Sequence, residues 1–197
     1  MREACFKRSR SFRTPHFRAQ ENDMELKILT EIDKLFYKDE IIQLLEESDN
    51  DFLPPLSRRG SPNDKAFLGE NNGSNGVLSY YTEMNRQPIL AAFSENKIVG
   101  FVSFREDNRD GENSSIYVST LVVAKAARGQ GLTRGMYDYL SSTAFPEHAF
   151  RTRTWSTNAA HIKILSRFGF HETKRLENDR GAGIDTVYYE RPATVRR

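Results

Sequence analysis

The stretch 121-LVVAKAARGQGLTR-134 runs from an apolar segment straight into two closely spaced glycines and then into a helical pattern. Gly129 and Gly131 leave backbone N–H groups uncovered by any Cβ, at the start of a helix whose first amides lack an intrahelical acceptor. The helix dipole adds positive potential there, so the turn suits a phosphate or diphosphate group. The spacing is neither that of a P-loop nor the Gly-x-Gly-x-x-Gly of dinucleotide folds. On these residues alone, an ordinary strand-to-helix turn is the alternative.

Strands and helices alternate around this turn. Short apolar runs bounded by turn residues predict strands at 26–29, 89–93, 98–104, 115–124, 149–155, 170–176 and 184–190. Three- and four-residue apolar spacing predicts helices at 32–47, 77–86, 132–140 and 158–168. The segment between the first two helices is rich in Pro, Gly and Asn, which is typical of a long surface loop. We therefore expect an α/β fold of the α+β type, with helices flanking a central mixed sheet.

The length of 197 residues, with 38% hydrophobic and 11% aromatic side chains, fits one compact domain. We assign residues 24–192 to that domain and 193–197 to a tail. Residues 1–23 carry six basic and three acidic residues with almost no aliphatic ones, so we expect a disordered basic extension. An arginine-rich targeting or nucleic-acid-binding arm is the alternative for this segment.

Composition also excludes several classes of function. A net charge of +2 does not indicate a nucleic-acid partner. The longest apolar runs are far shorter than the roughly 20 residues that a membrane helix needs. A single cysteine, Cys5, forms neither an internal disulfide nor a multi-cysteine zinc site. We expect a soluble, cytoplasmic protein with no metal.

Two motifs resemble those of the GCN5-related N-acetyltransferase (GNAT) family. The acetyl-CoA signature of that family is Arg or Gln, two residues, Gly, one residue, then Gly or Ala, directly after a central strand. Arg128 to Thr133 matches it except that Thr133 replaces the last small residue. Family members also often have Asn, ten residues, then Gly-Phe, and here Asn158 is followed by Gly169-Phe170. The resemblance covers roughly residues 24–192.

The resemblance implies that acetyl-CoA is the co-substrate. It places the pantetheine arm along the strand 121–123, where a backbone N–H near Val122 or Val123 would polarise the thioester carbonyl. Asn158 would contact the pantetheine region, or it caps the following helix. The cofactor-binding residues implied in this way are Leu121, Val122, Val123, Arg128, Gly129, Gln130, Gly131, Leu132, Thr133, Arg134 and Asn158. By analogy with relatives, pairing into a homodimer is a further expectation.

The catalytic groups are not identified by the resemblance. The usual tyrosine position is Leu165, and the glutamate position of the branch that acetylates protein N-termini is Arg153. Tyr117, Ser119 and His161 are the candidates to replace them, with Tyr188 and Tyr189 on the last strand. For each of these, ordinary packing or exposure to solvent is the alternative, and we expect His161 to face solvent.

The acceptor side is expected to be an apolar pocket with an arginine at its edge. The residues that fall there are Pro55, Arg58, Tyr80 and Tyr81. An arginine at that place would favour an acceptor with a carboxylate or a phosphate. The sequence thus predicts an N-acetyltransferase that moves the acetyl group of acetyl-CoA to a primary amine of a small molecule by direct attack in a ternary complex. A catalytically degenerate module that binds acetyl-CoA for regulation is the alternative.

Overall fold

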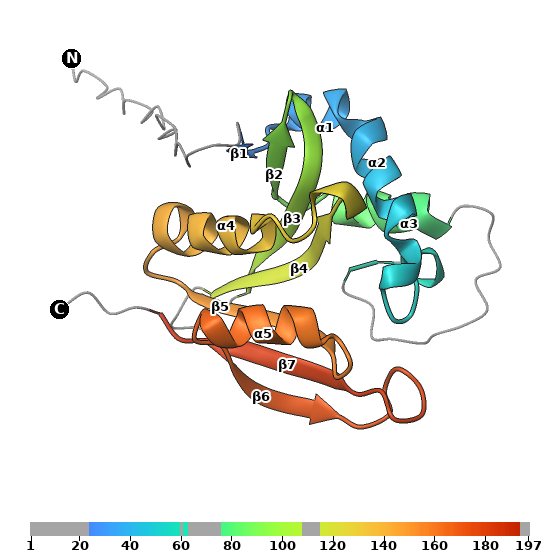
Figure 1. Ribbon diagram of the computed structural model, residues 1–197, viewed down its shortest axis with the longest axis vertical. Helices are drawn as coiled ribbons and strands as arrows, with labels where there is room; N and C mark the ends of the chain where they lie inside the picture. Colours follow the sequence, from blue (N-terminus) through green and yellow to red (C-terminus); the bar gives the residue numbers. More distant parts are fainter. Residues whose placement is uncertain (1–23, 60, 63–75, 108–114, 194–197) are drawn as a thin grey trace, which may run out of the picture.

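The computed structural model describes residues 24–59, 61–62, 76–107 and 115–193. The extension predicted at 1–23 and the residues 194–197 of the tail lie outside the described residues. The described strands form one mixed sheet in the order β1-β2-β3-β4-β5-β7-β6, in which only β4 and β5 run parallel (Figure 1). They are β1 (Met24–Ile28), β2 (Ile89–Ser94), β3 (Lys97–Asp107), β4 (Ser115–Val123), β5 (Ala149–Trp155), β6 (His171–Leu176) and β7 (Thr186–Arg191).

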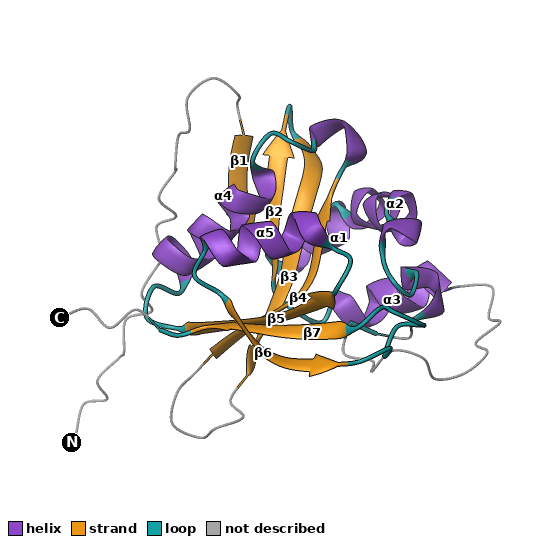
Figure 2. Cartoon of the chain, turned by 60° about the horizontal axis from the view of Figure 1, so that its bottom comes forward, coloured by secondary structure: helices purple, strands orange, loops and turns teal. Residues whose placement is uncertain are grey.

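Helices cover both faces of the sheet (Figure 2). One apolar core lies between the sheet and α4 (Leu132–Tyr139), which continues as a π-helical turn (Leu140–Ala144), together with α5 (Ala159–Arg167). A second core packs α2 (Lys38–Glu47) and α3 (Gly76–Met84) against the other face. The short helix α1 (Glu31–Phe36) lies outside both cores, and its apolar side chains Ile32, Leu35 and Phe36 are exposed. The predicted mixed sheet with flanking helices is confirmed. Within the described ranges, no helix is both long and apolar enough to span a bilayer.

The helix predicted over 32–47 is wrong in one respect, because it is two helices that meet at Tyr37. Thr30 caps the first helix: its hydroxyl accepts from the Asp33 N–H (3.1 Å), and the Asp33 carboxylate accepts from the Thr30 N–H (2.9 Å). Tyr37 then leaves helical geometry, and its ring packs edge-on against Phe93 of β2, 5.2 Å between ring centroids. The helix is interrupted at the residue whose ring packs against the sheet, so this contact accounts for two helices in place of one.

Strands β4 and β5 part halfway along their length. Their parallel pairing joins Ser115–Val118 to Ala149–Thr152, and the described pairs of β4 beyond Val118 lie only on the β3 side. At the parting, Ser119 is an extra residue, since Phe104 pairs with Val118 and Ser103 with Thr120. Such a bulge bends the strand. In Figure 1 the strands accordingly fan from nearly upright in β2 and β3 to nearly horizontal in β6 and β7.

Three short 3₁₀ turns complete the architecture. The first two, η1 (Asp49–Asp51) and η2 (Leu56–Arg58), lie in the segment predicted as a long loop. The third, η3 (Lys125–Ala127), joins β4 to the glycine turn. Ser57 fastens η2 to η1, because its N–H and Oγ both donate to the Asp49 carboxylate, at 2.7 and 2.8 Å. The remainder of the predicted loop, residues 63–75, lies outside the described residues.

Candidate active site

The glycine turn connects the parted end of β4 to α4. Gly129 and Gly131 adopt positive φ angles of 79° and 82°, and Gly131 is the N-cap of α4. Both are exposed, and a Cβ built on either would meet no protein atom within 4 Å. The first intrahelical bond is that of Gly135 N–H to Gly131 O (2.9 Å), so the amides of the turn before it have no acceptor within the helix. The chain thus presents an open cradle of backbone donors that fits a diphosphate.

The polar side chains of the turn are engaged by protein groups. Arg128 donates through Nη2 to Asp51 in η1 (2.5 Å) and through Nε to the Val123 carbonyl (3.2 Å). Gln130 donates to the Ala126 carbonyl (3.3 Å). Arg134 lies 3.6 Å from Asp138 one helical turn away. The residues predicted from Arg128 to Arg134 therefore form the glycine turn and the first turn of α4. Because Arg128 and Arg134 lie beside Asp51 and Asp138, the backbone N–H groups are better placed than these arginines to bind an anion.

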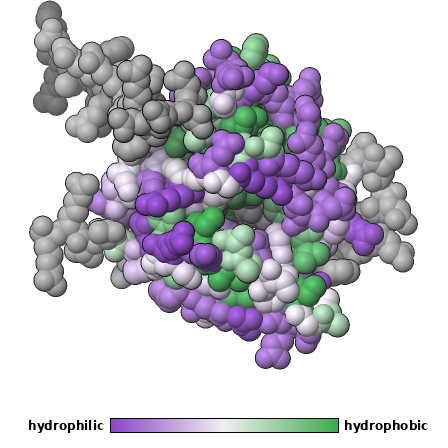
Figure 3. Space-filling view, viewed as in Figure 1, coloured by the Kyte–Doolittle hydropathy of each residue, from purple (hydrophilic) through white to green (hydrophobic). Residues whose placement is uncertain are grey.

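The predicted pantetheine strand lies at the parting of β4 and β5. Leu121 and Val123 pack on the core below α4 and α5, whereas Val122 packs on the core below α2 and α3. The backbone of this stretch is free of a β5 partner in the described pairing. In the space-filling view, hydrophobic atoms show between α4 and α5 on this face (Figure 3).

Asn158 caps α5. Its Oδ1 accepts from the His161 N–H (3.3 Å), and its Nδ2 donates to Thr154 Oγ1 (3.1 Å). Helix capping was one of the two roles that the sequence allowed for Asn158, and the structure shows it. Contact of Asn158 with the pantetheine region stays a prediction.

His161 and Tyr137 meet between α5 and α4. The Tyr137 hydroxyl and His161 Nε2 are 3.0 Å apart, with the rings stacked at 6.1 Å between centroids. The expectation that His161 faces solvent is wrong: the ring is partly buried, and burial lowers its pKa to about 4. Burial raises the pKa of Tyr137 above its ordinary value. Both groups are consequently neutral at pH 7. Leu165, one turn after His161, is fully buried in the core.

Sequence reasoning did not single out Tyr137. The apolar spacing of α4 was carried by its neighbours Met136 and Tyr139, and nothing in that pattern distinguishes a tyrosine with a hydrogen-bonded hydroxyl from one that only fills space. The role of Tyr137 is indicated by its hydrogen bond with His161, and this contact is visible only in the folded protein, where α4 packs beside α5.

On the opposite face of the parting, buried polar side chains line β4. The Tyr80 hydroxyl of α3 and Thr120 Oγ1 are 2.7 Å apart. Ser119 donates to Gln87 Oε1 (2.5 Å) and lies 2.9 Å from Ser103 Oγ. The Arg105 guanidinium sits over the Tyr117 ring, 4.6 Å from its centroid. The predicted candidates Tyr117 and Ser119 thus lie on the same face of the sheet as Tyr80, while His161 lies on the opposite face.

The remaining acceptor-side residues are distributed differently from the expectation. Tyr81 is buried in the core with α2, and Pro55 precedes η2 as its cap. Arg58 is exposed, whereas its neighbour Arg59 turns inward and donates to the carbonyls of Pro54 (3.0 Å) and Leu53 (2.7 Å). The 3₁₀ turn ends at Arg58. Arg59 has an extended backbone, so its side chain points to the opposite side from that of Arg58.

Two further arginines reach the same region. Arg153, on β5, donates to the Pro62 carbonyl (3.2 Å) and is paired in register with Tyr188 of β7. Arg180, between β6 and β7, is buried: its Nε donates to Thr186 Oγ1 (2.8 Å) and its Nη1 to the Leu53 carbonyl. Arg180 lies between the strands predicted at 170–176 and 184–190, and nothing in the local sequence indicates that its side chain is buried against Thr186 and Leu53.

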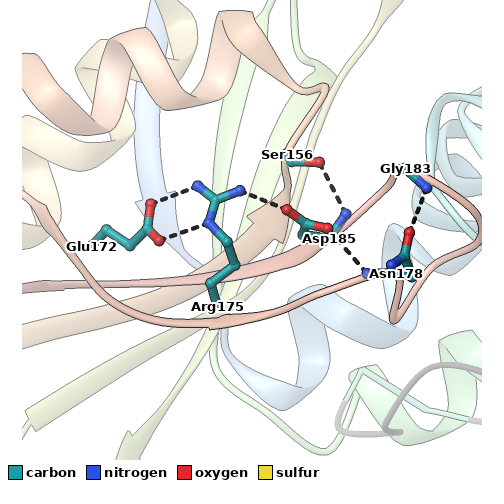
Figure 4. Close-up of polar contacts among 6 residues, drawn as sticks. All are labelled: Ser156, Glu172, Arg175, Asn178, Gly183 and Asp185. Carbon is teal, nitrogen blue, oxygen red and sulfur yellow. Dashed lines mark hydrogen bonds and ion pairs between the residues drawn. The ribbon is translucent and has the colours of Figure 1, made fainter.

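The hairpin that carries Arg180 is fastened by charged contacts (Figure 4). Arg175 forms a two-bond pair with Glu172 (2.9 and 2.8 Å) and a third bond to Asp185 (2.7 Å). Asp185 also accepts from the Asn178 N–H (3.0 Å) and donates its own N–H to Ser156 Oγ (2.9 Å). These contacts hold the two ends of the turn together, and Arg180 itself is held by Thr186 and the Leu53 carbonyl.

Comparison with known proteins accords with this geometry. The family model described as the acetyltransferase (GNAT) family matches residues 43–170. The chain belongs to the GNAT family. No curated protein sequence matches it.

Solved structures of GNAT acetyltransferases share the fold. The chain is similar to yncA, a putative acetyltransferase from Salmonella typhimurium solved with its cofactor acetyl-CoA, with a TM-score of 0.60 and 17% identity over 89% of this chain and 96% of that one. It is also similar to the ribosomal-protein-alanine N-acetyltransferase from Brucella melitensis (TM-score 0.58, 21% identity, 85% and 98% covered). Arabidopsis thaliana Naa50, solved with the bisubstrate analogue CoA-Ac-MVNAL, has a TM-score of 0.55 and 14% identity, with 85% and 97% covered. At these identities the likeness establishes the fold.

Proposed function

We propose that this GNAT member is an acetyl-CoA-dependent N-acetyltransferase that acetylates a primary amine of a small acceptor by direct attack. The observation that carries the proposal is the parting of β4 and β5. It separates an open backbone cradle at Gly129 and Gly131 from the polar side chains on the other face of β4, which include Tyr117, Ser119 and Thr120. Two ligands entering from opposite faces would meet at the freed backbone of β4.

Each part of the chain has a defined task in this proposal. Bound acetyl-CoA supplies the thioester whose acetyl group is transferred. The amides around Gly131 hold its diphosphate, and a backbone N–H near Val122 or Val123 stabilises negative charge on the carbonyl oxygen during attack. The absence of a β5 partner leaves this part of β4 accessible for that bond.

Proton transfer needs groups other than the usual pair, since Leu165 is buried and apolar and Arg153 is a cation. Tyr117 lies on the acceptor face of β4, with the Arg105 guanidinium 4.6 Å from its ring centroid, and we assign its hydroxyl to hydrogen-bond the incoming amine or a water that accepts its proton. His161 is neutral at pH 7, so it does not serve as a proton donor in its protonated form; its described side-chain partner is the Tyr137 hydroxyl.

The test combines calorimetric titration with acetyl-CoA and measurement of free-CoA release across polyamines, amino acids, aminoglycosides and peptides. Binding with turnover of at least one amine is the expected result. Absence of acetyl-CoA binding contradicts the proposal. Binding without release across the panel would favour the degenerate regulatory module, for which the residues at 153 and 165 are the supporting observation.

A further inference from the structure

Strand β1 lies at one edge of the sheet, beside β2 (Figure 2). Among the described strands it has no partner on its other side. The Leu29 N–H donates to the Ile89 carbonyl (2.9 Å), in register with the β1–β2 ladder. Because hydrogen-bonded positions alternate in an antiparallel ladder, the N–H and C=O groups of Met24, Leu26 and Ile28 point away from β2. The outer edge of β1 therefore offers a row of backbone groups for pairing.

Apolar and charged side chains alternate along β1. Met24, Leu26 and Ile28 share one face, where they are partly buried against the core below α4 and α5. Glu25 and Lys27 lie on the other face, where Glu25 is exposed and the Lys27 side chain is 41% exposed. An edge strand with this incompletely covered apolar face is suited to pairing with another strand.

The opposite edge of the sheet is protected against such pairing. Strand β6 is exposed along nearly its whole length and carries Glu172, Lys174 and Arg175. Its register with β7 also shifts between Glu172 and Lys174. Charges and irregularities of this kind block association between sheet edges. Strand β1 has neither protection, because its register with β2 is regular and three of its five residues are apolar.

The sequence of β1 is complementary to itself in one register. If two copies of β1 pair antiparallel about a two-fold axis at Leu26, Glu25 lies opposite Lys27 of the second copy, and Met24 lies opposite Ile28. Opposite charges facing each other across an antiparallel pair attract, and like charges repel. Moving the axis by one residue keeps the backbone groups in phase, but it places Glu25 opposite Glu25 or Lys27 opposite Lys27. Charge therefore selects the register centred on Leu26.

We propose that β1 pairs with β1 of a second copy of this chain, so that the two seven-stranded sheets become continuous through a two-fold axis at Leu26. The same surface is used on both copies, so the assembly closes as a dimer. The two-fold axis keeps the faces of the sheets aligned, and the apolar residues of the two strands cover one another on the α4 side.

Helix α1 supplies further apolar area next to this strand. It follows β1 after two residues, and three of its side chains, Ile32, Leu35 and Phe36, are 80%, 76% and 78% exposed. Asp33 accepts from Lys27 Nζ (2.8 Å), which holds the first turn of α1 on the charged face of β1. Lys27 keeps two further donors for Glu25 of the second copy. A five-residue strand is only about 17 Å long, so the exposed side of α1 is needed to approach the roughly 800 Å² per partner of a stable interface.

The first experiment is sedimentation equilibrium of the full chain over a range of concentrations. We expect the wild type to show a monomer–dimer equilibrium. Glu25→Lys places lysines opposite each other at both symmetric positions, and it should weaken dimerisation about tenfold or more. Glu46→Lys makes the same charge change at an exposed position of α2, and it should leave the dissociation constant unchanged.

Mixing two variants tests the register. Lys27→Glu places glutamates opposite each other and should also dimerise weakly. When Glu25→Lys is mixed with Lys27→Glu, opposite charges face each other again, and we expect a heterodimer that is tighter than either homodimer. A wild type that stays monomeric overturns the proposal, and pairing of residues 1–23 with β1 in the same chain would give that result. An equally tight dimer in Glu25→Lys also overturns it.

Cysteine cross-linking locates the axis without changing charge. In a Cys5→Ser background, Leu26→Cys puts two thiols at one hydrogen-bonded pair, with about 5.5 Å between Cα atoms, which a disulfide spans. Ile28→Cys is the matched control on the same face, because its two copies would lie four residues apart along the strands, about 13 Å. With oxidised glutathione, we expect a disulfide-linked dimer of Leu26→Cys alone. Cross-linking of neither variant, or of both alike, contradicts the proposed pairing even if Lys27→Glu does not fold.

Discussion

Arg128, at the entrance of the glycine turn, donates through Nη2 to the carboxylate of Asp51, with 2.5 Å between the two atoms. The contact joins the cofactor side of the molecule to η1, which leads directly to Leu53, whose carbonyl accepts from Arg59 and Arg180. The two faces of the proposed active site are therefore linked by an ion pair as well as by the sheet. The side chains are 45% and 40% exposed, so solvent weakens the attraction.

A double-mutant cycle with Asp51→Asn and Arg128→Gln measures this link. We expect a coupling below about 1 kcal/mol in the free energy of unfolding, because exposed pairs are screened. Urea unfolding at low and at 1 M salt checks it, and the coupling should shrink at high salt. A coupling that is larger and independent of salt would show that the pair is buried in solution.

Gly131→Ala should weaken acetyl-CoA binding about tenfold or more. A Cβ there meets no protein atom, so the cost to the free protein is that of a left-handed φ, about 1–2 kcal/mol, whereas the added methyl group enters the cradle. Gly169→Ala is the matched control: its φ is 75°, its Cβ is equally unobstructed, and it lies at the far end of α5. Calorimetric titration should separate the two variants, and equal affinities would remove the cradle assignment.

Gly76→Ala should destabilise the fold. A Cβ at Gly76 would lie 2.0 Å from the Ser57 carbonyl oxygen, so α3 or η2 must move. Overpacking of this kind costs about 1–3 kcal/mol, although alanine in a helix is ordinarily the more stabilising residue. Ser79→Ala, at an exposed position of the same helix, should have almost no effect in denaturant unfolding. A stabilised Gly76→Ala variant would show that the close approach is absent in solution.

Stability should fall with acid through His161. The folded protein holds this imidazole with a pKa of about 4, against 6.5 when unfolded, so the unfolded chain binds more protons between those values. The contribution is complete above pH 6.5 and is lost as pH decreases toward 4, by roughly 1–3 kcal/mol. His161→Gln should reduce the difference in unfolding free energy between pH 7.5 and pH 5. His171→Gln, at an exposed site on β6, should retain it.

The sequence was sufficient for the parts of the fold that local patterns encode. The apolar run before Arg128, the glycine spacing and the helical repeat after it together specify a strand, a turn and a helix, and β4 and α4 lie there. The strand at 149–155 and the cap at Asn158 follow from equally local signals. Family membership, first read from these two motifs, is confirmed by the family model.

The acceptor side could not be predicted in the same way. Arg59 and Arg180 come from a turn and a hairpin, and only the folded chain brings both to the Leu53 carbonyl. Arg58 and Arg59 are indistinguishable by residue type, and the end of a single 3₁₀ turn decides which one points inward. Tyr137 and His161 form a pair only through the packing of α4 on α5. Contacts between distant segments have no signature in one sequence.

The four-residue parallel pairing of β4 with β5 has a consequence for how the chain assembles. On one side of it lie β1 to β4, and on the other lie β5, β7 and β6, so each half-sheet is one continuous portion of the chain held by antiparallel ladders. Within each half, the β2-β3 hairpin joins its strands through residues 95–96 and the β6-β7 hairpin joins its strands through residues 177–185, whereas the parallel pair requires a crossover through α4. The two half-sheets can therefore fold separately, and we expect the four residue pairs between β4 and β5 to form last.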